Sequence, residues 1–102
     1  MAVFVTRLVQ PVSATAKTAT INIVTYRRNG GTIFYVENGN LIQIDVSAGE
    51  SKQLIIPANQ IIRVKTISWF SVAGDGGQLL TSESAADGAV FINGDVTIDF
   101  KD

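Results

Sequence analysis

The sequence predicts an all-β protein, and three observations support that prediction. Residues branched at Cβ dominate the apolar composition, because 12 isoleucines and 11 valines stand against 5 leucines, with 9 threonines besides. Such residues suit the pleated surface of a sheet better than a helix. Several stretches alternate apolar and polar residues at period two, and none keeps apolar residues at helical spacing for long. We therefore expect an antiparallel β-sandwich or jelly roll of about 7–8 short strands, with a small β-barrel as the alternative.

The bulk composition predicts a single domain over residues 1–102 and excludes several kinds of chemistry. The chain has no cysteine and no histidine, which removes disulfides, thiolate metal sites, the commonest general base and the commonest zinc ligand. A formal charge of −1 argues against nucleic acid as a partner. The N-terminus lacks the basic start and apolar run of a signal peptide, and no apolar run is long enough to cross a membrane. We expect a soluble protein, made in a cytoplasm, without a cofactor.

Two strands are expected before the clearest turn in the sequence. Residues 3–9 form the first, and Pro11 follows it because proline cannot donate to a ladder. Residues 13–18 are small and polar and connect it to residues 20–27, where apolar and polar residues alternate again. The glycines at positions 30 and 31 end this second strand.

Asn38-Gly39 gives the strongest local signal, a two-residue hairpin turn between residues 32–37 and 40–46. A type I′ turn fixes the register and pairs Tyr35 with Ile42, so that one face of the hairpin is apolar throughout and should be core. The other face is half apolar, and we expect a loop or another chain to cover part of it. That second face carries Thr32, Phe34, Val36, Leu41, Gln43 and Asp45.

The second half of the chain combines further strands with one long connection. Residues 53–56 form a short strand and residues 61–70 the longest one, whose alternation changes phase and so predicts a bulge near residues 65–66. Residues 74–88 form a polar connection of a length that is usually functional or ordered by a partner. Asn93-Gly94 predicts a second hairpin. Its shared face would carry Phe91, Val96, Ile98 and Phe100.

No pattern predicts a catalytic, cofactor or metal site. The aspartates are scattered, whereas paired-carboxylate catalysis holds two such groups about 5 to 9 Å apart. Residues 74–77 (Gly-Asp-Gly-Gly) look like half of a calcium loop, but the next carboxylates, Glu83 and Asp87, are eight and twelve residues beyond Asp75. A hard cation needs roughly six or more oxygen ligands, so a flexible loop is the favoured interpretation. We therefore expect a protein without enzymatic activity.

Trp69 and Phe70 are neighbours on an expected strand, so their rings point to opposite faces. A sandwich core takes one ring, and core packing of Trp69 is the favoured interpretation. The other ring then meets a loop, a partner protein or a sugar. Together with the half-apolar hairpin face and the long connection, this pair defines a candidate protein interface. Its members are Phe34, Val36, Leu41, Trp69, Phe70, Leu79 and Leu80.

Arg27, Arg28, Arg63 and Lys65 form a basic cluster around the expected strands. We interpret these residues as charges at strand edges, which deter edge-to-edge pairing, or as ion-pair partners for a neighbouring subunit. Stacking and pairing with nucleic acid is the alternative interpretation.

The connections at residues 13–20 and 71–88 are rich in alanine, glycine, serine and threonine. With the all-β pattern, the missing signal peptide and the lack of cysteine and histidine, they resemble the small β-sandwich structural proteins of tailed-bacteriophage virions. That group includes capsid decoration proteins, head-fibre bases and tail components. The resemblance covers the whole chain and includes no diagnostic motif. It implies a virion protein, made in the host cytoplasm, that assembles as a homo-oligomer or on a capsid or tail lattice.

Three functions are therefore open. The first is a non-enzymatic assembly subunit whose partners are other protein subunits. The second is a carbohydrate- or receptor-binding module with Trp69 or Tyr35 as the ring on which a glycan stacks. The third is an enzyme, which would need an essential aspartate or glutamate. No nucleic acid or membrane is expected as a partner.

Overall fold

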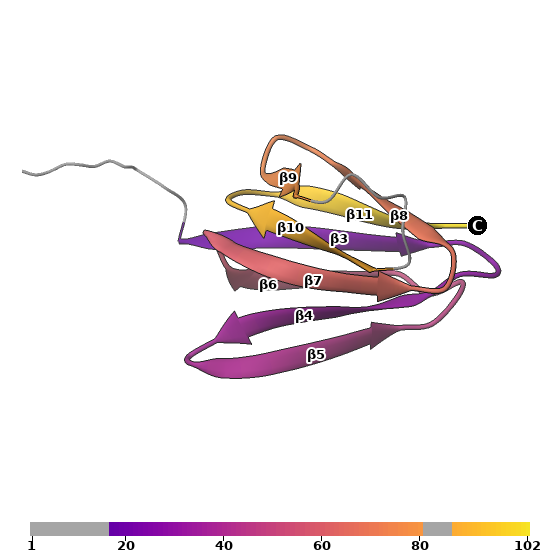
Figure 1. Cartoon of the computed structure of the whole chain (residues 1–102), viewed down its shortest axis with the longest axis horizontal. Helices are drawn as coiled ribbons and strands as arrows, with labels where there is room; N and C mark the ends of the chain where they lie inside the picture. Colours follow the sequence, from indigo (N-terminus) through magenta and orange to yellow (C-terminus); the bar gives the residue numbers. More distant parts are fainter. Residues whose placement is uncertain (1–16, 81–86) are drawn as a thin grey trace, which may run out of the picture.

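The computed structural model describes residues 17–80 and 87–102 (Figure 1). These residues form nine strands in two sheets and contain no helix, so the all-β prediction is confirmed. The two sheets pack as a sandwich, and the alternative of a small barrel is not what the chain adopts. The strand expected at residues 3–9 lies outside the described residues. The strand labels are those of Figure 1, which begin at β3.

The larger sheet has five strands in the order β5-β4-β7-β10-β9, and all neighbours in it run antiparallel. Two of its neighbouring pairs, β4-β5 and β9-β10, are also consecutive in the sequence. The strands of this sheet are β4 (Gly31–Glu37), β5 (Asn40–Val46), β7 (Gln60–Thr66), β9 (Gly77–Leu79) and β10 (Asp87–Ile92).

The smaller sheet has four strands in the order β6-β3-β11-β8. Strands β3 and β11 run parallel, and the other two neighbouring pairs run antiparallel. No two neighbours in this sheet are consecutive in the sequence, because the chain passes through the five-stranded sheet between them. Its strands are β3 (Thr18–Thr25), β6 (Lys52–Pro57), β8 (Trp69–Ala73) and β11 (Val96–Lys101).

The core lies between the sheets and consists of the inward side chains of both. Alternation at period two buries every second residue along β3, β7, β10 and β11, as the sequence pattern predicts. The buried hydrophobic residues are Ala19, Ile21, Ile23, Ile33, Tyr35, Val46, Ile56, Ile62, Val64, Phe70, Val90, Ile92, Val96, Ile98 and Phe100.

Phe70, not Trp69, is the aromatic ring of β8 that enters the core. Phe70 is 2% exposed and pairs with Phe100 of β11, whereas Trp69 is 36% exposed on the outward face. The favoured interpretation, with Trp69 in the core, is therefore wrong. Phe70 is also wrong as an interface candidate, because its side chain is enclosed between the sheets.

The hairpin at Asn38-Gly39 is confirmed in its register and its turn. Tyr35 pairs with Ile42, and Asn38 and Gly39 have φ angles of 53° and 79°, as a type I′ turn requires. The apolar face of the hairpin lies on the core, where Tyr35 is buried and Ile42 is partly buried.

Residues 61–70 do not form one bulged strand. The chain leaves β7 at Thr66, passes through Ile67 and Ser68, and enters β8 in the opposite sheet. The change of phase in the sequence therefore marks a crossing between sheets, where the inward direction reverses, and the predicted bulge is wrong.

The second predicted hairpin is also wrong. Strand β10 belongs to the five-stranded sheet and β11 to the four-stranded sheet, so Asn93-Gly94 connects the two layers. Here the Gly76 carbonyl accepts hydrogen bonds from the N–H groups of Asn93 at 2.7 Å and Gly94 at 3.1 Å. Phe91 consequently faces outward, whereas Val96, Ile98 and Phe100 face the core.

The long connection expected at residues 74–88 is partly sheet. Residues Gly77–Leu79 form β9, which pairs with β10, and β10 begins at Asp87. Residues 81–86 lie outside the described part of the chain.

Candidate functional site

An apolar row crosses the outward face of the five-stranded sheet. The register places Leu41 of β5 opposite Val36 of β4, and Ile61 of β7 opposite Phe91 of β10. The β4–β7 pairing ends at Phe34 opposite Arg63, so Val36 and Ile61 lie two residues further along the same outward face, where the Gln60 side chain stands between the two strands. Opposite residues of neighbouring strands have their side chains on the same face. We use the term apolar row for Leu41, Val36, Ile61 and Phe91, which belong to four adjacent strands.

The apolar row is open to solvent. Leu41 is 70% exposed, Ile61 57% and Val36 46%, and Phe91 is partly exposed. Phe34 borders the row on the same face of β4 and is also partly exposed. Exposed apolar side chains that adjoin one another mark a surface for interaction more often than scattered ones do.

The backbone beneath the apolar row is held in place by Gln60. The Gln60 side chain accepts a hydrogen bond from the Val36 N–H at 2.8 Å and donates to the Val36 carbonyl at 3.0 Å. It also donates to the Pro57 carbonyl at 2.7 Å. The side chain thereby bridges β4 and β7 beyond their last backbone pair, Phe34 with Arg63.

A polar and charged row lies further along the same face, beyond Gln43, Phe34, Arg63 and Ala89. Asp45, Thr32, Lys65 and Asp87 stand side by side across the four strands. The Asp45 carboxylate accepts hydrogen bonds from Gln43 Nε2 at 3.1 Å and Thr32 Oγ1 at 2.9 Å. These two donors, with Gln43 the stronger, hold the pKa of Asp45 below its usual value, and the charge of Lys52 adds a smaller effect.

The predicted basic residues fall into two groups. Arg63 and Lys65 lie on β7, the middle strand of the larger sheet, so their interpretation as edge charges is wrong. Arg63 pairs with Asp87 of its own chain, with 2.8 Å between Nη2 and Oδ1. Arg27 and Arg28 lie exposed in the turn between β3 and β4.

The remaining interface candidates lie around the edge strand β9 and at β8. Leu80 donates its N–H to the Ala89 carbonyl at 2.9 Å and so lies beside the outward residues of β10. Leu79 pairs with the buried Val90 and therefore faces inward at the open edge, where it is 39% exposed. The structure thus gathers Phe34, Val36, Leu41 and Leu80 on one face and separates Trp69 from them.

Trp69 belongs to an aromatic corner on the other side of the sandwich. The Lys101 ammonium lies 5.5 Å from the centroid of the Tyr26 ring and 5.8 Å from that of Trp69. A cation over two rings orders all three side chains. We use the term aromatic corner for Tyr26, Trp69 and Lys101. Tyr35, the other ring considered for glycan stacking, is wrong as a platform because it is buried in the core. The same burial raises the pKa of the Tyr35 hydroxyl.

The buried Asn29 holds the aromatic corner in place. Its Nδ2 donates to the carbonyls of Lys101 at 2.7 Å and Trp69 at 3.2 Å. Its Oδ1 lies 2.7 Å from the Thr66 hydroxyl and accepts from the Ser68 N–H at 3.3 Å. At 1% exposure, Asn29 thus joins β11 and β8 of one sheet to the end of β7 in the other.

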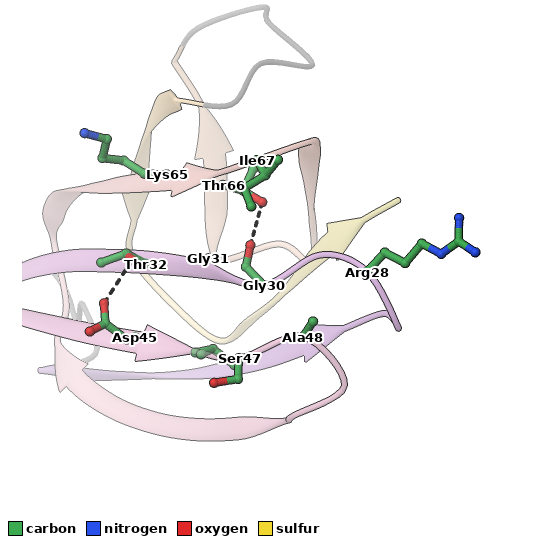
Figure 2. Close-up of a pocket in the computed structure, with 11 residues that line it drawn as sticks. Arg28, Gly30, Gly31, Thr32, Asp45, Ser47, Ala48, Lys65, Thr66 and Ile67 are labelled. Atoms are coloured by element: carbon green, nitrogen blue, oxygen red, sulfur yellow. Dashed lines mark hydrogen bonds between the residues drawn. The ribbon is translucent and has the colours of Figure 1, made fainter.

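An open hollow of about 560 Å³ lies at the end of the five-stranded sheet, and Figure 2 shows the residues that line it. Backbone of Gly30 and Gly31 and the small residues of the Ser47-Ala48 turn make up much of its wall. The side chains of Arg28 and Lys65 extend away from it in opposite directions (Figure 2). The Thr32 and Thr66 hydroxyls in its wall donate to Asp45 and to the Gly30 carbonyl of the same chain.

The acidic side chains of the described residues do not gather into a metal site. Within residues 17–80 and 87–102, no three aspartate or glutamate side chains gather where they could hold a metal ion. The same part of the chain contains no helix that is long and apolar enough to cross a membrane.

Sequence reasoning missed four residues of these two surfaces. Ile61 and Phe91 complete the apolar row, and Tyr26 and Lys101 complete the aromatic corner. The alternation of Val90, Phe91 and Ile92 could have identified Phe91, because both of its aliphatic neighbours must face the core. No local signal places Lys101 over two rings that are distant from each other in the sequence.

Comparisons with known proteins support the fold of this chain and do not identify its function. No family model matches the chain, and no curated protein matches it. Among solved structures, it is similar to a bacterial adhesin from Mobiluncus mulieris containing intramolecular disulfide, isopeptide and ester bond cross-links, with a TM-score of 0.53 and 13% identity. The match covers 81% of this chain and 40% of the adhesin chain. The chain therefore has a β-sandwich fold that also occurs in an adhesin.

Proposed function

We propose that this chain is a non-enzymatic assembly protein that docks onto other protein subunits through the outward face of its five-stranded sheet. The observation that carries the proposal is the apolar row, because three of its four side chains are about half exposed or more. Sheets of soluble proteins normally turn polar residues outward. Covering the apolar row removes that surface from water, which favours association.

The arrangement around the row suits a protein partner. Apolar residues form its centre, and the charged row of Asp45, Lys65 and Asp87 forms a rim on one side. An apolar centre with a polar rim is the usual anatomy of a protein interface. The rim would set the orientation of the partner, whereas the apolar row would supply most of the affinity.

The finer proposal is that the chain is a structural component of a tailed-bacteriophage virion, either on the capsid or in the tail. Its support is the compositional resemblance: an all-β chain without cysteine or histidine and with alanine-, glycine-, serine- and threonine-rich connections. The protein would then be made in the host cytoplasm and act in the virion, on a lattice of other subunits.

Sedimentation with purified capsids and tails of tailed bacteriophages tests both levels of the proposal. We expect the wild-type chain to pellet with particles and Ile61→Lys to lose at least about tenfold in affinity, because a charge would be buried in the interface. Ile55→Lys is the matched control, since Ile55 is 66% exposed on the outward face of the other sheet. Equal binding by wild type and Ile61→Lys contradicts docking through the row, and no pelleting with any particle contradicts the virion role.

A second candidate function is glycan binding at the aromatic corner. The Trp69 and Tyr26 rings are each more than one-third exposed, and Lys101 between them could pair with an acidic sugar. The chain has one tryptophan, so its intrinsic fluorescence reports on this corner. We expect saturable quenching by an acidic glycan that Lys101→Met weakens. A flat titration with a panel of acidic and neutral glycans contradicts this candidate.

A further inference from the structure

The four edge strands of the sandwich differ in how well they are protected against pairing with another chain. Strand β9 has three residues, β8 has five, and β6 begins at Lys52 and ends at Pro57. Short strands, lysine and proline are common protections of an edge. Strand β5 has seven residues, contains no proline, glycine or lysine, and lies outermost in its sheet (Figure 1).

The hairpin register shows which backbone groups of β5 are free. The pair Glu37 and Asn40, next to the two-residue turn, is hydrogen-bonded, so alternate residues from Leu41 onward direct their N–H and C=O groups away from β4. Gln60 confirms this alternation, because it binds both backbone groups of Val36, the residue opposite Leu41, on the far side of β4.

Leu41 and Gln43 therefore present two donors and two acceptors along an open edge. The next residue in this series, Asp45, has its carbonyl bound by Lys52 Nζ at 2.9 Å. No hydrogen bond of the described structure uses the outward backbone groups of Leu41 or Gln43. Free backbone groups at a regular edge are the recognition element for addition of another strand.

We infer that β5 pairs antiparallel with β5 of a second copy, about a two-fold axis at Ile42, and joins the two five-stranded sheets into one. In this register, the backbone of Leu41 meets that of Gln43 in the second copy, and the reverse, with up to four hydrogen bonds. The inference rests on the proposed assembly role and adds a second copy of the chain as a partner.

A second copy fits this edge because the outward backbone groups of β5 are placed symmetrically about Ile42. The two free positions, Leu41 and Gln43, flank Ile42 on either side, so each strand supplies what the other lacks. Ile42 is only partly buried beside the core and would meet its own counterpart across the axis.

Charge and symmetry also favour self-pairing. The single charged residue of β5, Asp45, would lie opposite Gly39 of the second copy, so no like charges meet and the bond from Lys52 is kept. Pairing about a two-fold axis uses the same edge in both copies and therefore stops at a dimer.

Sedimentation velocity of the purified full chain over a range of concentrations gives the first test. We expect a monomer–dimer equilibrium that Leu41→Lys weakens at least about tenfold, because lysine at an edge opposes strand addition. Ile55→Lys, on the edge strand β6, and Ile61→Lys, in the apolar row away from the edge, should leave the equilibrium unchanged. A wild-type monomer at all concentrations, or a dimer lost with Ile61→Lys alone, overturns the inference.

Cysteine crosslinking gives the second test and locates the axis. The chain has no cysteine, so Ile42→Cys introduces a single thiol. Non-hydrogen-bonded pairs have Cα atoms about 4.5 Å apart, a separation that a disulfide can span. We expect Ile42→Cys to form a covalent dimer on mild oxidation and Gln53→Cys, on β6, to form none. Equal crosslinking of both variants overturns the pairing. Docking through the apolar row is tested separately by particle binding of Ile61→Lys and can survive that result.

Discussion

The two outward faces of the sandwich have the same strand alternation but opposite chemistry. The five-stranded sheet carries the apolar row of Leu41, Val36, Ile61 and Phe91 on its outward face. On the four-stranded sheet, outward positions of β3 and β11 carry residues such as Asn22, Thr97 and Asp99, and Gln53 Nε2 donates to Asn22 Oδ1 at 2.9 Å. The difference lies in the residues at outward positions, because the inward faces of both sheets are largely apolar.

In each strand, the core requires apolar residues at the inward positions. The surroundings of the sheet decide which residues suit the outward positions. Hydrogen-bonded polar residues on the four-stranded sheet are satisfied within the chain or by water. The apolar residues of the five-stranded sheet gain nothing from water, which is why we propose that a partner covers them. Ile55 and Trp69 are exceptions on the polar face, on the two edge strands β6 and β8, and scattered exposed apolar residues are common.

Replacing Asn29, whose hydrogen bonds connect the two sheets, should have the largest effect on stability. We expect Asn29→Ala to lower the free energy of unfolding by about 3 kcal/mol, because several buried hydrogen bonds are lost and the carbonyls of Trp69 and Lys101 lose their donor. Chemical denaturation measures the change. Asn22→Ala is the control on the solvated face and should cost less than about 1 kcal/mol. Similar losses for both variants would contradict the role of Asn29 as the joint.

A substitution at Gly39, in the turn of the β4-β5 hairpin, should have the second-largest effect on stability. Gly39 has a φ of 79° with open space around it, so Gly39→Val should cost about 1–2 kcal/mol through backbone strain alone. Gly39→Asn is the control, because asparagine tolerates this conformation. Amide hydrogen exchange should become faster in β5 and stay unchanged in β11 of the other sheet. Equal destabilisation by valine and asparagine would show that strain is not the cause.

The chemistry of the two outward faces can be compared directly with matched lysine substitutions. Ile61→Lys and Ile55→Lys should each change the free energy of unfolding by less than about 0.5 kcal/mol, because both positions are exposed. Binding of the hydrophobic dye anilinonaphthalene sulfonate to the native protein should fall with Ile61→Lys and stay the same with Ile55→Lys. The reverse order would mean that the apolar row is not the dominant hydrophobic surface.

The smallest expected effect is the pH dependence from Asp45, at the rim of the apolar row. Hydrogen bonds from Gln43 and Thr32 lower its pKa in the folded state, so the ionised form stabilises the fold above the ordinary carboxyl pKa of 3.8. That stabilisation is lost as the pH falls through the lowered value. We expect wild type to exceed Asp45→Asn in stability at pH 7 and to lose this difference at low pH. A difference that stays constant down to pH 2 would contradict the assignment.

Local sequence patterns predicted much of the fold because their physical causes are local. The turn at Asn38-Gly39 fixes its own hairpin, and alternation along β3 decides which side chains face the core. The same reasoning failed at residues 61–70 and at Asn93-Gly94, where the chain changes sheets. A break in alternation looks the same in the sequence whether the strand bulges or crosses to the other layer.

Local sequence patterns were enough to predict that this protein is all-β, that its first clear hairpin has one register, and that surface apolar residues such as Val36 and Leu41 face away from the core. Packing of the two sheets was needed to show that Phe70 rather than Trp69 enters the core, that Asn29 joins the sheets, and that Ile61 and Phe91 complete the apolar row. The reason is that periodicity along one strand sets only the face of each side chain, whereas a surface forms from strands distant in sequence, whose order depends on packing of the whole chain.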